Sequence, residues 1–508
     1  PALPIDQPKL KAAVALYVRP MPRRDLPALL IAFAISLVVR WPLVDRPLSA
    51  HHEYCTAFTL VALTNWWEDG FATHHGMPSG GWIREGEALY PAGPEHRNER
   101  AVGLYYFSHP PLAYDLPYVL FVLTNTAPNA AGLQWMNMFF HLLTAIGLYQ
   151  AVRLAAGPER PQAPLFASVL YLFTPATLWF HGNAYMSDMF VQVPWVWHLV
   201  FALRILRAEA RPSAGTWAGF IITLFLTLYT SWLGVFALIT VVLVAFLWCR
   251  MGRQVPILPI IGGATLAFAA AFGLTAWRYL QVIDAGALFA HFQSRFAVRG
   301  SFGAGIDLPS LLQQVMVNYR ISYLPLIILL LILLLVRWRR GNGPGRALPH
   351  LKLFVALAGL PVLLDHLLLL QYAEHDFAAL KAAPVLCGLA GAGLAGLQYR
   401  WRWAMLMVTC LTGVAYFYRT NPIPGHDGGR YQKELELGQF IAENAAPDEL
   451  VFGVGIITEP QVTWYAHRNV LGVADEDAAR VTLKKHGLSR GVVVEPIDGG
   501  YKATHITP

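Results

Sequence analysis

The sequence predicts an α-helical polytopic membrane protein with about eleven transmembrane helices, juxtamembrane helices on the outer face and a small C-terminal α/β domain. Of its 508 residues, 56% are hydrophobic and only 14% are charged, and the mean hydropathy of +0.43 lies outside the range of soluble globular proteins. Apolar runs long enough to cross a bilayer recur between residues 26 and 418. From residue 419 the composition becomes that of a soluble protein, which predicts a separate domain over residues 419–508.

The first apolar run, Leu26–Val39, follows a short basic segment. Positively charged residues beside a membrane helix stay in the cytoplasm, so residues 1–25 are predicted to be a cytoplasmic segment. The helix then serves as its own targeting signal, and the chain reaches the outer side at Arg40. The basic residues that set this orientation are Lys9, Lys11, Arg19, Arg23 and Arg24.

The run Pro110–Leu123 decides the topology. It is short, opens with two prolines and contains Asp115 and Pro117, so it could either cross the membrane or lie along it. If it lies along the membrane, every later arginine cluster falls on the cytoplasmic side with the N-terminus. We therefore predict a juxtamembrane helix within an outer first loop, residues 45–125. The clusters are Arg153/Arg160, Arg204/Arg207/Arg211, Arg250/Arg253, Arg337/Arg339/Arg340/Arg346 and Arg400/Arg402.

The transmembrane domain is predicted to cover residues 26–418, with further outer loops at 181–188 and 281–320. The C-terminal domain then also lies outside, and its pattern indicates a helix at Tyr431–Asn444 with strands at Leu450–Val454 and Gly491–Val494. After Leu26–Val39, the predicted spans are Ala131–Val152, Pro164–Phe180, Met189–Leu206, Ala214–Tyr229, Leu233–Trp248, Pro256–Trp277, Ile321–Val336, Leu351–Leu370, Leu380–Leu397 and Trp403–Tyr418.

Charge and cysteine content exclude other classes of function. A net charge of +7 would suggest nucleic-acid binding in a soluble protein, but here the arginines form short clusters between apolar runs, as orientation signals do. No nucleic acid is therefore expected as a partner. The four cysteines form no CxxC pair, so neither a disulfide framework nor a zinc cluster is predicted; they are Cys55, Cys249, Cys387 and Cys410.

Polar residues are concentrated in the first outer loop, although a polar cluster beside a membrane is costly unless it has a use. Glu53 follows Ser49, a candidate N-cap, and Asp188 stands where the fourth span begins. Two carboxylates at one membrane face suit a transferase, which must take a proton from an acceptor hydroxyl. Each could instead only cap a helix. Six of the seventeen histidines also lie in this loop: His51, His52, His74, His75, His96 and His109.

The same loop offers ligands for a divalent metal ion, with His51, His52 and Glu53 as the possible set. No HxxxH or comparable helix-face spacing supports such a site, and adjacent histidines point in different directions. The sequence therefore requires no cofactor, and a bound metal ion remains an alternative.

The segment Phe107–Tyr114 resembles the HPPL(A/G)K segment of protein O-mannosyltransferases and the FEKP…GYW segment of lipid A aminoarabinose transferases, both membrane glycosyltransferases of the GT-C class. In that class an Asp-Glu pair opens the first outer loop, and His52-Glu53 occupies its place here. Asp188 matches the Asp of the second loop. Two later segments, Tyr372–Phe377 followed by Pro384, and Gln461–Arg468, resemble outer-face elements of the bacterial branch.

Three departures from the family pattern affect the expected roles. His52 stands where the family has the first Asp, so the general base is either Glu53 or His52 itself. Tyr114 stands where the family has a Lys after the HPPLA stretch. His109 replaces part of a Glu-Lys pair and could supply a cationic contact.

The resemblance implies an inverting glycosyltransferase that moves a hexosyl or pentosyl group from a polyprenyl-phosphate donor to a hydroxyl of a lipid, glycan or protein. It places the enzyme in the bacterial cytoplasmic membrane, with the active site and C-terminal domain on the periplasmic or extracellular side. Glu53, Asp188 and His52 are the expected catalytic residues, and cations would stabilise the departing phosphate. The candidates for substrate and phosphate binding are His109, Tyr114, Arg278, Arg295, Arg320, His375 and Lys381.

Two alternatives stay open at this point. A transporter or flippase for a lipid-linked glycan would place ionisable residues or broken helices near the membrane midplane. Polar residues at midspan are few, which disfavours it. A ligase that moves a whole glycan would share the chemistry and need a wider acceptor groove. The midspan polar residues are His141, His198, Asp365 and His366.

Overall fold

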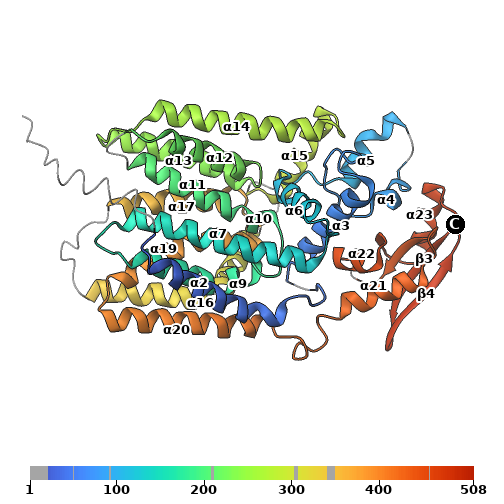
Figure 1. Ribbon diagram of the computed structural model, residues 1–508. Coiled ribbons are helices and arrows are strands. Elements are labelled where there is room, and N and C mark those ends of the chain that lie inside the picture. Colours follow the sequence, from blue (N-terminus) through green and yellow to red (C-terminus); the bar gives the residue numbers. More distant parts are fainter. Residues whose placement is uncertain are drawn as a thin grey trace, which may run out of the picture.

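The structure is a computed structural model that describes residues 21–49, 51–90, 93–207, 211–301, 307–339, 349–456 and 458–508. The predicted cytoplasmic segment, residues 1–25, lies outside these ranges except for its last five residues, and so do Arg340 and Arg346. Long helices run side by side in one bundle, and a small sheet at the C-terminus lies beyond one end of it (Figure 1). Because the sequence predicts that end to be the outer one, it is called the outer end below.

Eight helices, or pairs of consecutive helices, among the described residues are long and apolar enough to cross a membrane. They correspond to eight of the eleven predicted spans. In chain order they are α2 (Asp25–Arg40), α7 (Ala130–Ala156), α10 with α11 (Ser187–Phe190 and Gln192–Leu206), α13 (Leu233–Arg250), α14 (Ile257–Leu280), α16 (Leu308–Arg339), α17 (Pro349–Leu368), and α18 with α19 (Asp376–Ala379 and Ala383–Ala395).

The other three predicted spans are also helical but depart from an ideal span. Pro164–Phe180 is divided into α8 (Ala163–Phe173) and α9 (Pro175–Phe180), because proline has no N–H to continue the helix. Helix α12 (Ala214–Leu228) has only 15 residues. Helix α20 (Tyr399–Thr420) has 22 residues but carries arginines near both ends. The predicted polytopic helical fold is thus confirmed.

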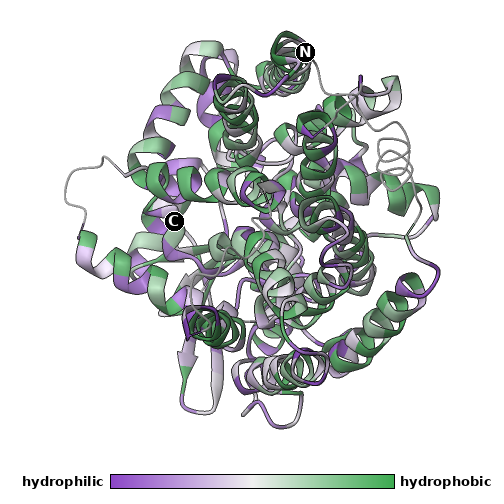
Figure 2. Ribbon diagram, turned by 90° about the vertical axis from the view of Figure 1, so that its left-hand side faces the viewer, coloured by the Kyte–Doolittle hydropathy of each residue, from purple (hydrophilic) through white to green (hydrophobic). Residues whose placement is uncertain are grey.

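The outward faces of the bundle are apolar (Figure 2). Leu258 on α14, Leu331 on α16 and Leu411 on α20 are 77%, 60% and 63% exposed. An apolar surface of this extent is costly in water and is stable in contact with lipid. The bundle therefore has the surface of a membrane domain.

The first loop folds at the outer end as helices α3 (Tyr54–Asp69), α4 (Ile83–Glu87), α5 (Arg97–Leu104) and α6 (Leu112–Leu123). Helix α6 has 12 residues, about 18 Å of length, against a hydrocarbon core of about 30 Å. It packs against α3 at the same end of the bundle as the C-terminal sheet (Figure 1). Its place agrees with the predicted juxtamembrane helix. In the third outer loop lies α15 (Ala285–Arg299).

The C-terminal sheet has four strands in the order β2-β1-β3-β4. Strand β1 pairs in parallel with β2 and β3, and β3 forms an antiparallel hairpin with β4. Alternate residues serve different cores: Val451 and Val492 pack with α21 and α22, whereas Phe452 and Val493 pack with α23. The bounds are β1 Leu450–Val454, β2 Val470–Val473, β3 Gly491–Ile497, β4 Gly500–Ile506, α21 Lys433–Asn444, α22 Pro460–Ala466 and α23 Glu476–His486.

Candidate active site

Asp188 lies at the centre of a polar cluster at the outer end of the bundle. Its side chain is fully buried, and Lys381 Nζ is 3.0 Å from its Oδ1. The hydroxyl of Tyr372 donates to its Oδ2 at 2.7 Å. Lys381 also lies 2.9 Å from Asp365 Oδ2, so two buried carboxylates share one cation. Because Asp188 contacts side chains of other elements and caps no backbone N–H, a helix-cap role does not account for it.

His109 and two arginines surround the other side of Tyr372. His109 Nε2 is 3.4 Å from the Tyr372 hydroxyl, and its Nδ1 is buried with no hydrogen-bond partner among the described residues. Burial lowers the pKa of His109 to about 4, so its ring is neutral at physiological pH. Arg295 donates to Ser108 Oγ at 3.2 Å, and the guanidinium of Arg299 lies 5.1 Å from the Tyr372 ring centre. The cluster therefore offers a neutral imidazole and two half-buried cations.

His51 and His52 both bind Asp376. His51 Nε2 is 2.7 Å from Oδ2 of this carboxylate, and His52 Nε2 is 2.7 Å from Oδ1. Asp376 begins α18, 325 residues away from His51 in the chain. His375, one of the predicted phosphate ligands, lies edge-on to His52 with ring centres 5.9 Å apart. No role of Asp376 was predicted from the sequence.

Glu53 does not have the position predicted for a general base. It is fully buried, and Arg46 binds both of its oxygens, at 2.7 and 2.9 Å. The backbone N–H of Ser49 donates a third hydrogen bond to Oε2, and α3 begins at Tyr54, so Ser49 is not the N-cap. Burial raises the pKa of the Glu53 carboxyl, and Arg46 offsets part of the rise. With its oxygens engaged inside the protein, Glu53 fits a structural ion pair.

Two predicted phosphate ligands lie apart from this cluster. Arg278 donates to Asp115 at 2.6 Å, to the Tyr229 hydroxyl at 2.9 Å and to the Gly76 carbonyl. Its donors thus join α14 to two parts of the first loop and to the end of α12. Arg320 is exposed on α16 and makes no hydrogen bond or ion pair within the described ranges. The structure therefore supports neither residue as a phosphate ligand.

The remaining predicted ligand is Tyr114. It is buried in the apolar core beside Phe58 and Tyr106. Tyr106 stacks on His109 with ring centres 6.2 Å apart, so Tyr114 lies one side chain behind the cluster and supports its wall.

The predicted metal ligands do not converge. Glu53 turns to Arg46, whereas His51 and His52 turn to Asp376. The described part of the chain contains no group of three His, Cys, Asp or Glu side chains that could hold a metal ion. The residues predicted as metal ligands therefore do not fit a divalent metal ion.

The loop that carries these histidines is held by the C-terminal part of the chain. The backbone N–H of Leu48 donates to the Tyr465 hydroxyl at 2.5 Å, and Gln461 donates to the Ser49 carbonyl at 2.9 Å. The C-terminal domain thus forms part of the support of the site. The further contacts are Tyr431, whose ring centre is 3.7 Å from the Arg46 guanidinium, and Asn421, 2.9 Å from His51 Nδ1.

An apolar groove begins beside the cluster. It runs from Pro110 between α13, α14 and α15, past Phe272 and Phe292. Trp232 on its wall donates to the Ser108 carbonyl at 2.7 Å, next to the hydroxyl bound by Arg295. A polar cluster and a lipid-facing apolar groove are therefore adjacent.

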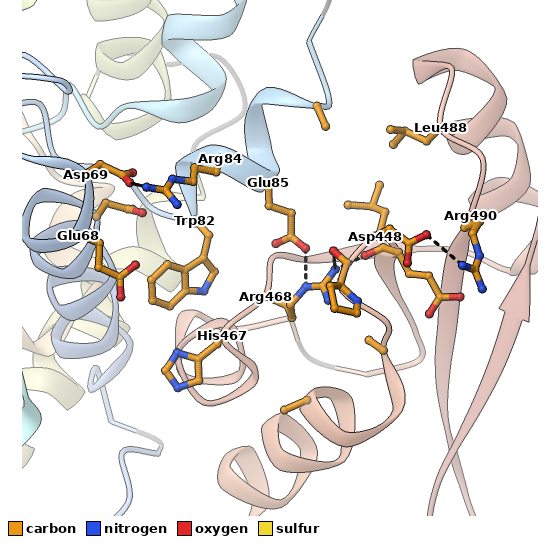
Figure 3. A pocket seen from close by; sticks show the side chains of 17 residues that line it. Glu68, Asp69, Trp82, Arg84, Glu85, Asp448, His467, Arg468, Leu488 and Arg490 are labelled. Atoms are coloured by element: carbon orange, nitrogen blue, oxygen red, sulfur yellow. Dashed lines mark hydrogen bonds and ion pairs between the residues drawn. The ribbon is translucent and has the colours of Figure 1, made fainter.

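A second, polar cleft of about 680 Å³ separates the first loop from the C-terminal domain (Figure 3). Its charged side chains pair with each other: Arg468 binds Glu85 across the cleft at 2.7 Å, and Arg84 binds Asp69. Asn469 donates to the Trp82 carbonyl at 2.8 Å. These contacts join the two parts of the outer region.

Comparison with solved structures identifies the fold. ArnT from Cupriavidus metallidurans bound to undecaprenyl phosphate matches with a TM-score of 0.59 and 15% identity, over 92% of this chain and 93% of that chain. The oligosaccharyltransferase AglB from Archaeoglobus fulgidus, in complex with an inhibitory peptide and a dolichol-phosphate, matches with a TM-score of 0.55 and 14% identity, over 93% and 69%. The chain has the GT-C fold. No family model and no curated protein sequence matches it.

Three residues of the cluster were not predicted from the sequence: Asp376, Tyr372 and Asp365. They bind the predicted residues His51 and His52, Asp188, and Lys381, respectively. Tyr372 and Asp376 lie in the Tyr372–Phe377 segment, whose resemblance to an outer-face element was the available signal. The sequence places Asp365 inside a predicted span as one of its few polar residues. No motif in the sequence indicates its ion pair with Lys381, 16 residues later.

Proposed function

We propose that the chain is an inverting glycosyltransferase that moves a sugar from a polyprenyl-phosphate donor to a hydroxyl acceptor at the outer face of the bacterial cytoplasmic membrane. The observation that carries this proposal is the polar cluster of Asp188, His109, Arg295 and Arg299 beside the apolar groove that begins at Pro110. A lipid phosphate has a charged head and an apolar chain, and this pair of surfaces complements both parts.

The donor phosphate is proposed to bind Arg295 and Arg299, with His109 and the Tyr372 hydroxyl beside it. These groups stabilise the negative charge that develops on the departing phosphate. Lys381 keeps Asp188 ionised from behind, since it contacts Asp188 and Asp365. The lipid phosphates named with ArnT and AglB support this class of donor.

The acceptor is proposed to enter from the outer side, where the first loop and the C-terminal domain meet. Asp188 orients its hydroxyl, and a general base takes the proton as the new bond forms, which contributes typically 10²–10⁴-fold to the rate. One displacement at the anomeric carbon inverts its configuration.

The test uses the purified protein in lipid nanodiscs with a lipid extract that contains polyprenyl-phosphate sugars. We expect release of polyprenyl phosphate and a glycosylated acceptor, both identified by mass spectrometry. Arg299→Ala should raise the donor KM about tenfold, because one charge-assisted contact is lost. Arg320→Ala is the matched control, since Arg320 is exposed and has no partner in the described ranges.

The products also separate the alternatives. Movement of an intact lipid-linked sugar across vesicles without release of polyprenyl phosphate would replace the transferase by a flippase. An acceptor that gains a whole glycan would indicate a ligase.

A further inference from the structure

We infer that His52 is the general base of the transfer, that Asp376 holds it in the tautomer that accepts a proton, and that His51 is a fixed cation on the same carboxylate. The inference rests on the proposed function and names the group that receives the acceptor's proton.

The hydrogen bonds of His51 require a proton on both ring nitrogens. The amide nitrogen of Asn421 donates to the Phe417 carbonyl, so the other amide atom, which faces His51 Nδ1 at 2.9 Å, is the oxygen. Nδ1 must therefore donate. Nε2 faces Asp376 Oδ2 at 2.7 Å and must donate as well. His51 is thus an imidazolium, and its ring stacks on Trp179 with centres 4.7 Å apart, a favourable place for a cation.

Asp376 fixes the tautomer of His52. Its Oδ1 lies 2.7 Å from His52 Nε2 in an ion-pair contact, too close for two atoms that both present an electron pair, so Nε2 carries the hydrogen and Nδ1 has the free electron pair. The imidazolium of His51 already balances the negative charge of Asp376, and His52 can remain neutral. Nδ1 has one polar neighbour in the described ranges, the Tyr54 hydroxyl at 3.4 Å, a distance that leaves room for an acceptor hydroxyl.

The other titratable and charged groups around His52 come from two directions. His375, directly after the η3 segment (Tyr372–Glu374), faces it, and Glu374 and Arg299 act on His375. On its own loop the neighbours are His51 and Tyr54. Asp376 is the carboxylate in direct contact with the ring.

The backbone is held in a costly conformation that aims both rings at Asp376. His51 and His52 have φ values of +58° and +64°, which L-residues rarely adopt. Successive residues of this kind persist only where the surroundings fix them, and they occur mainly at functional sites. Here Asp376, Asn421 and Trp179 fix them, the last by donating from Nε1 to the His51 carbonyl at 3.0 Å.

The base lies next to the Asp188 cluster. Tyr372, which donates to Asp188, has its ring centre 5.3 Å from that of Phe377, and Phe377 lies 4.9 Å from the His52 ring centre. The Phe377 ring therefore lies between His52 and Tyr372, and it joins the base to the Asp188 cluster.

The acceptor oxygen attacks the anomeric carbon, and its proton moves to His52 Nδ1. The bond from the anomeric carbon to the phosphate oxygen breaks, and its electron pair leaves with polyprenyl phosphate. His52 then returns the proton to water.

The kinetic test compares His52→Gln, Asp376→Asn and the control His74→Gln. His74 pairs with Asp69 at 3.1 Å in the same loop and is more buried than His52, with 5% against 18% of its side chain exposed, but it lies outside the site. We expect His52→Gln and Asp376→Asn each to lower kcat by roughly 10²–10⁴-fold while the donor KM changes less than threefold.

A second measurement does not depend on transfer. Diethyl pyrocarbonate reacts with an unprotonated imidazole nitrogen, and the side chains of His51 and His52 are almost equally exposed, at 19% and 18%. Peptide mass spectrometry should find His52 modified and His51 protected, and Asp376→Asn should make His51 reactive.

Three results would overturn the inference: wild-type kcat in His52→Gln, wild-type kcat in Asp376→Asn, or equal modification of His51 and His52. The predicted labelling without any transfer from a polyprenyl-phosphate sugar would uphold the protonation states and reject the donor instead.

Discussion

At the scale of single residues, Asp188 gives the sharpest test. Asp188→Asn keeps the side-chain volume and can still accept the Tyr372 hydroxyl, but it loses the charge that pairs with Lys381. Lys381 retains Asp365, so the fold should survive. We expect kcat to fall by about 10²-fold or more, measured as polyprenyl phosphate release. The exposed Asp284→Asn is the control, and near-normal turnover of Asp188→Asn would leave Asp188 a purely structural role.

His109 should make the protein sensitive to acid. Its pKa of about 4 in the folded protein is below the ordinary value of 6.5, so between these values the unfolded chain binds a proton that the folded chain does not. The contribution of neutral His109 to the free energy of unfolding is therefore fully present above pH 6.5 and is lost as the pH drops. His109→Gln should remove about 2 kcal/mol of the loss between pH 7 and pH 5. The check is the thermal midpoint of both proteins in detergent at each pH, and parallel curves would contradict it.

The part of the candidate site that could be predicted from the sequence is the part that neighbouring residues in the chain define. Asp188 stands at the start of an apolar run, and its place in the chain implied its side of the membrane. The partners of His51 and His52 were not predictable, because Asp376 lies 325 residues from His51 and only the packing of α18 against the first loop joins them. Glu53 was assigned a catalytic role because a sequence cannot show that Arg46 binds both of its oxygens.

At the scale of elements, the contacts of α22 with the Leu48–Ser49 loop should matter for turnover. Tyr465→Phe leaves the buried N–H of Leu48 without its acceptor, at a cost of about 1–3 kcal/mol. We expect kcat to fall severalfold with the donor KM nearly unchanged, since the loop carries His52 and not the phosphate ligands. Tyr501→Phe, on β4 and without a hydrogen bond in the described ranges, is the matched control. Equal activity of the two variants would show that the loop holds its shape unaided.

Element prediction succeeded for the helices and less well for the sheet. Hydropathy identifies a span because lipid contact demands a long apolar surface. The break at Thr174 between α8 and α9 follows from Pro175, which the sequence shows but hydropathy does not. Strands β2 and β4 were not predicted, because β2 has only four residues and β4 alternates apolar with polar residues.

At the scale of the whole molecule, the first loop and the C-terminal domain should be accessible from the same side. In a Cys249→Ala background, a membrane-impermeant maleimide should label Glu87→Cys and Lys484→Cys in intact cells. Arg253→Cys, at the opposite end of the bundle, should react only after permeabilisation. All three positions are exposed. Protection of either outer position would mean that α6 crosses the membrane.

The bond between Leu48 and Tyr465 also sets an order of assembly. The two residues are 417 positions apart, and at roughly 5–20 residues per second synthesis needs about 20–80 s to cover that distance. During this interval the loop that carries His51 and His52 exists first without Asp376 and Asn421, which follow His51 by 325 and 370 residues, and to the end without Tyr465. We therefore expect a chain that lacks its C-terminal domain to insert but to show no transfer, because this loop is not fully held until that domain has been made and has docked.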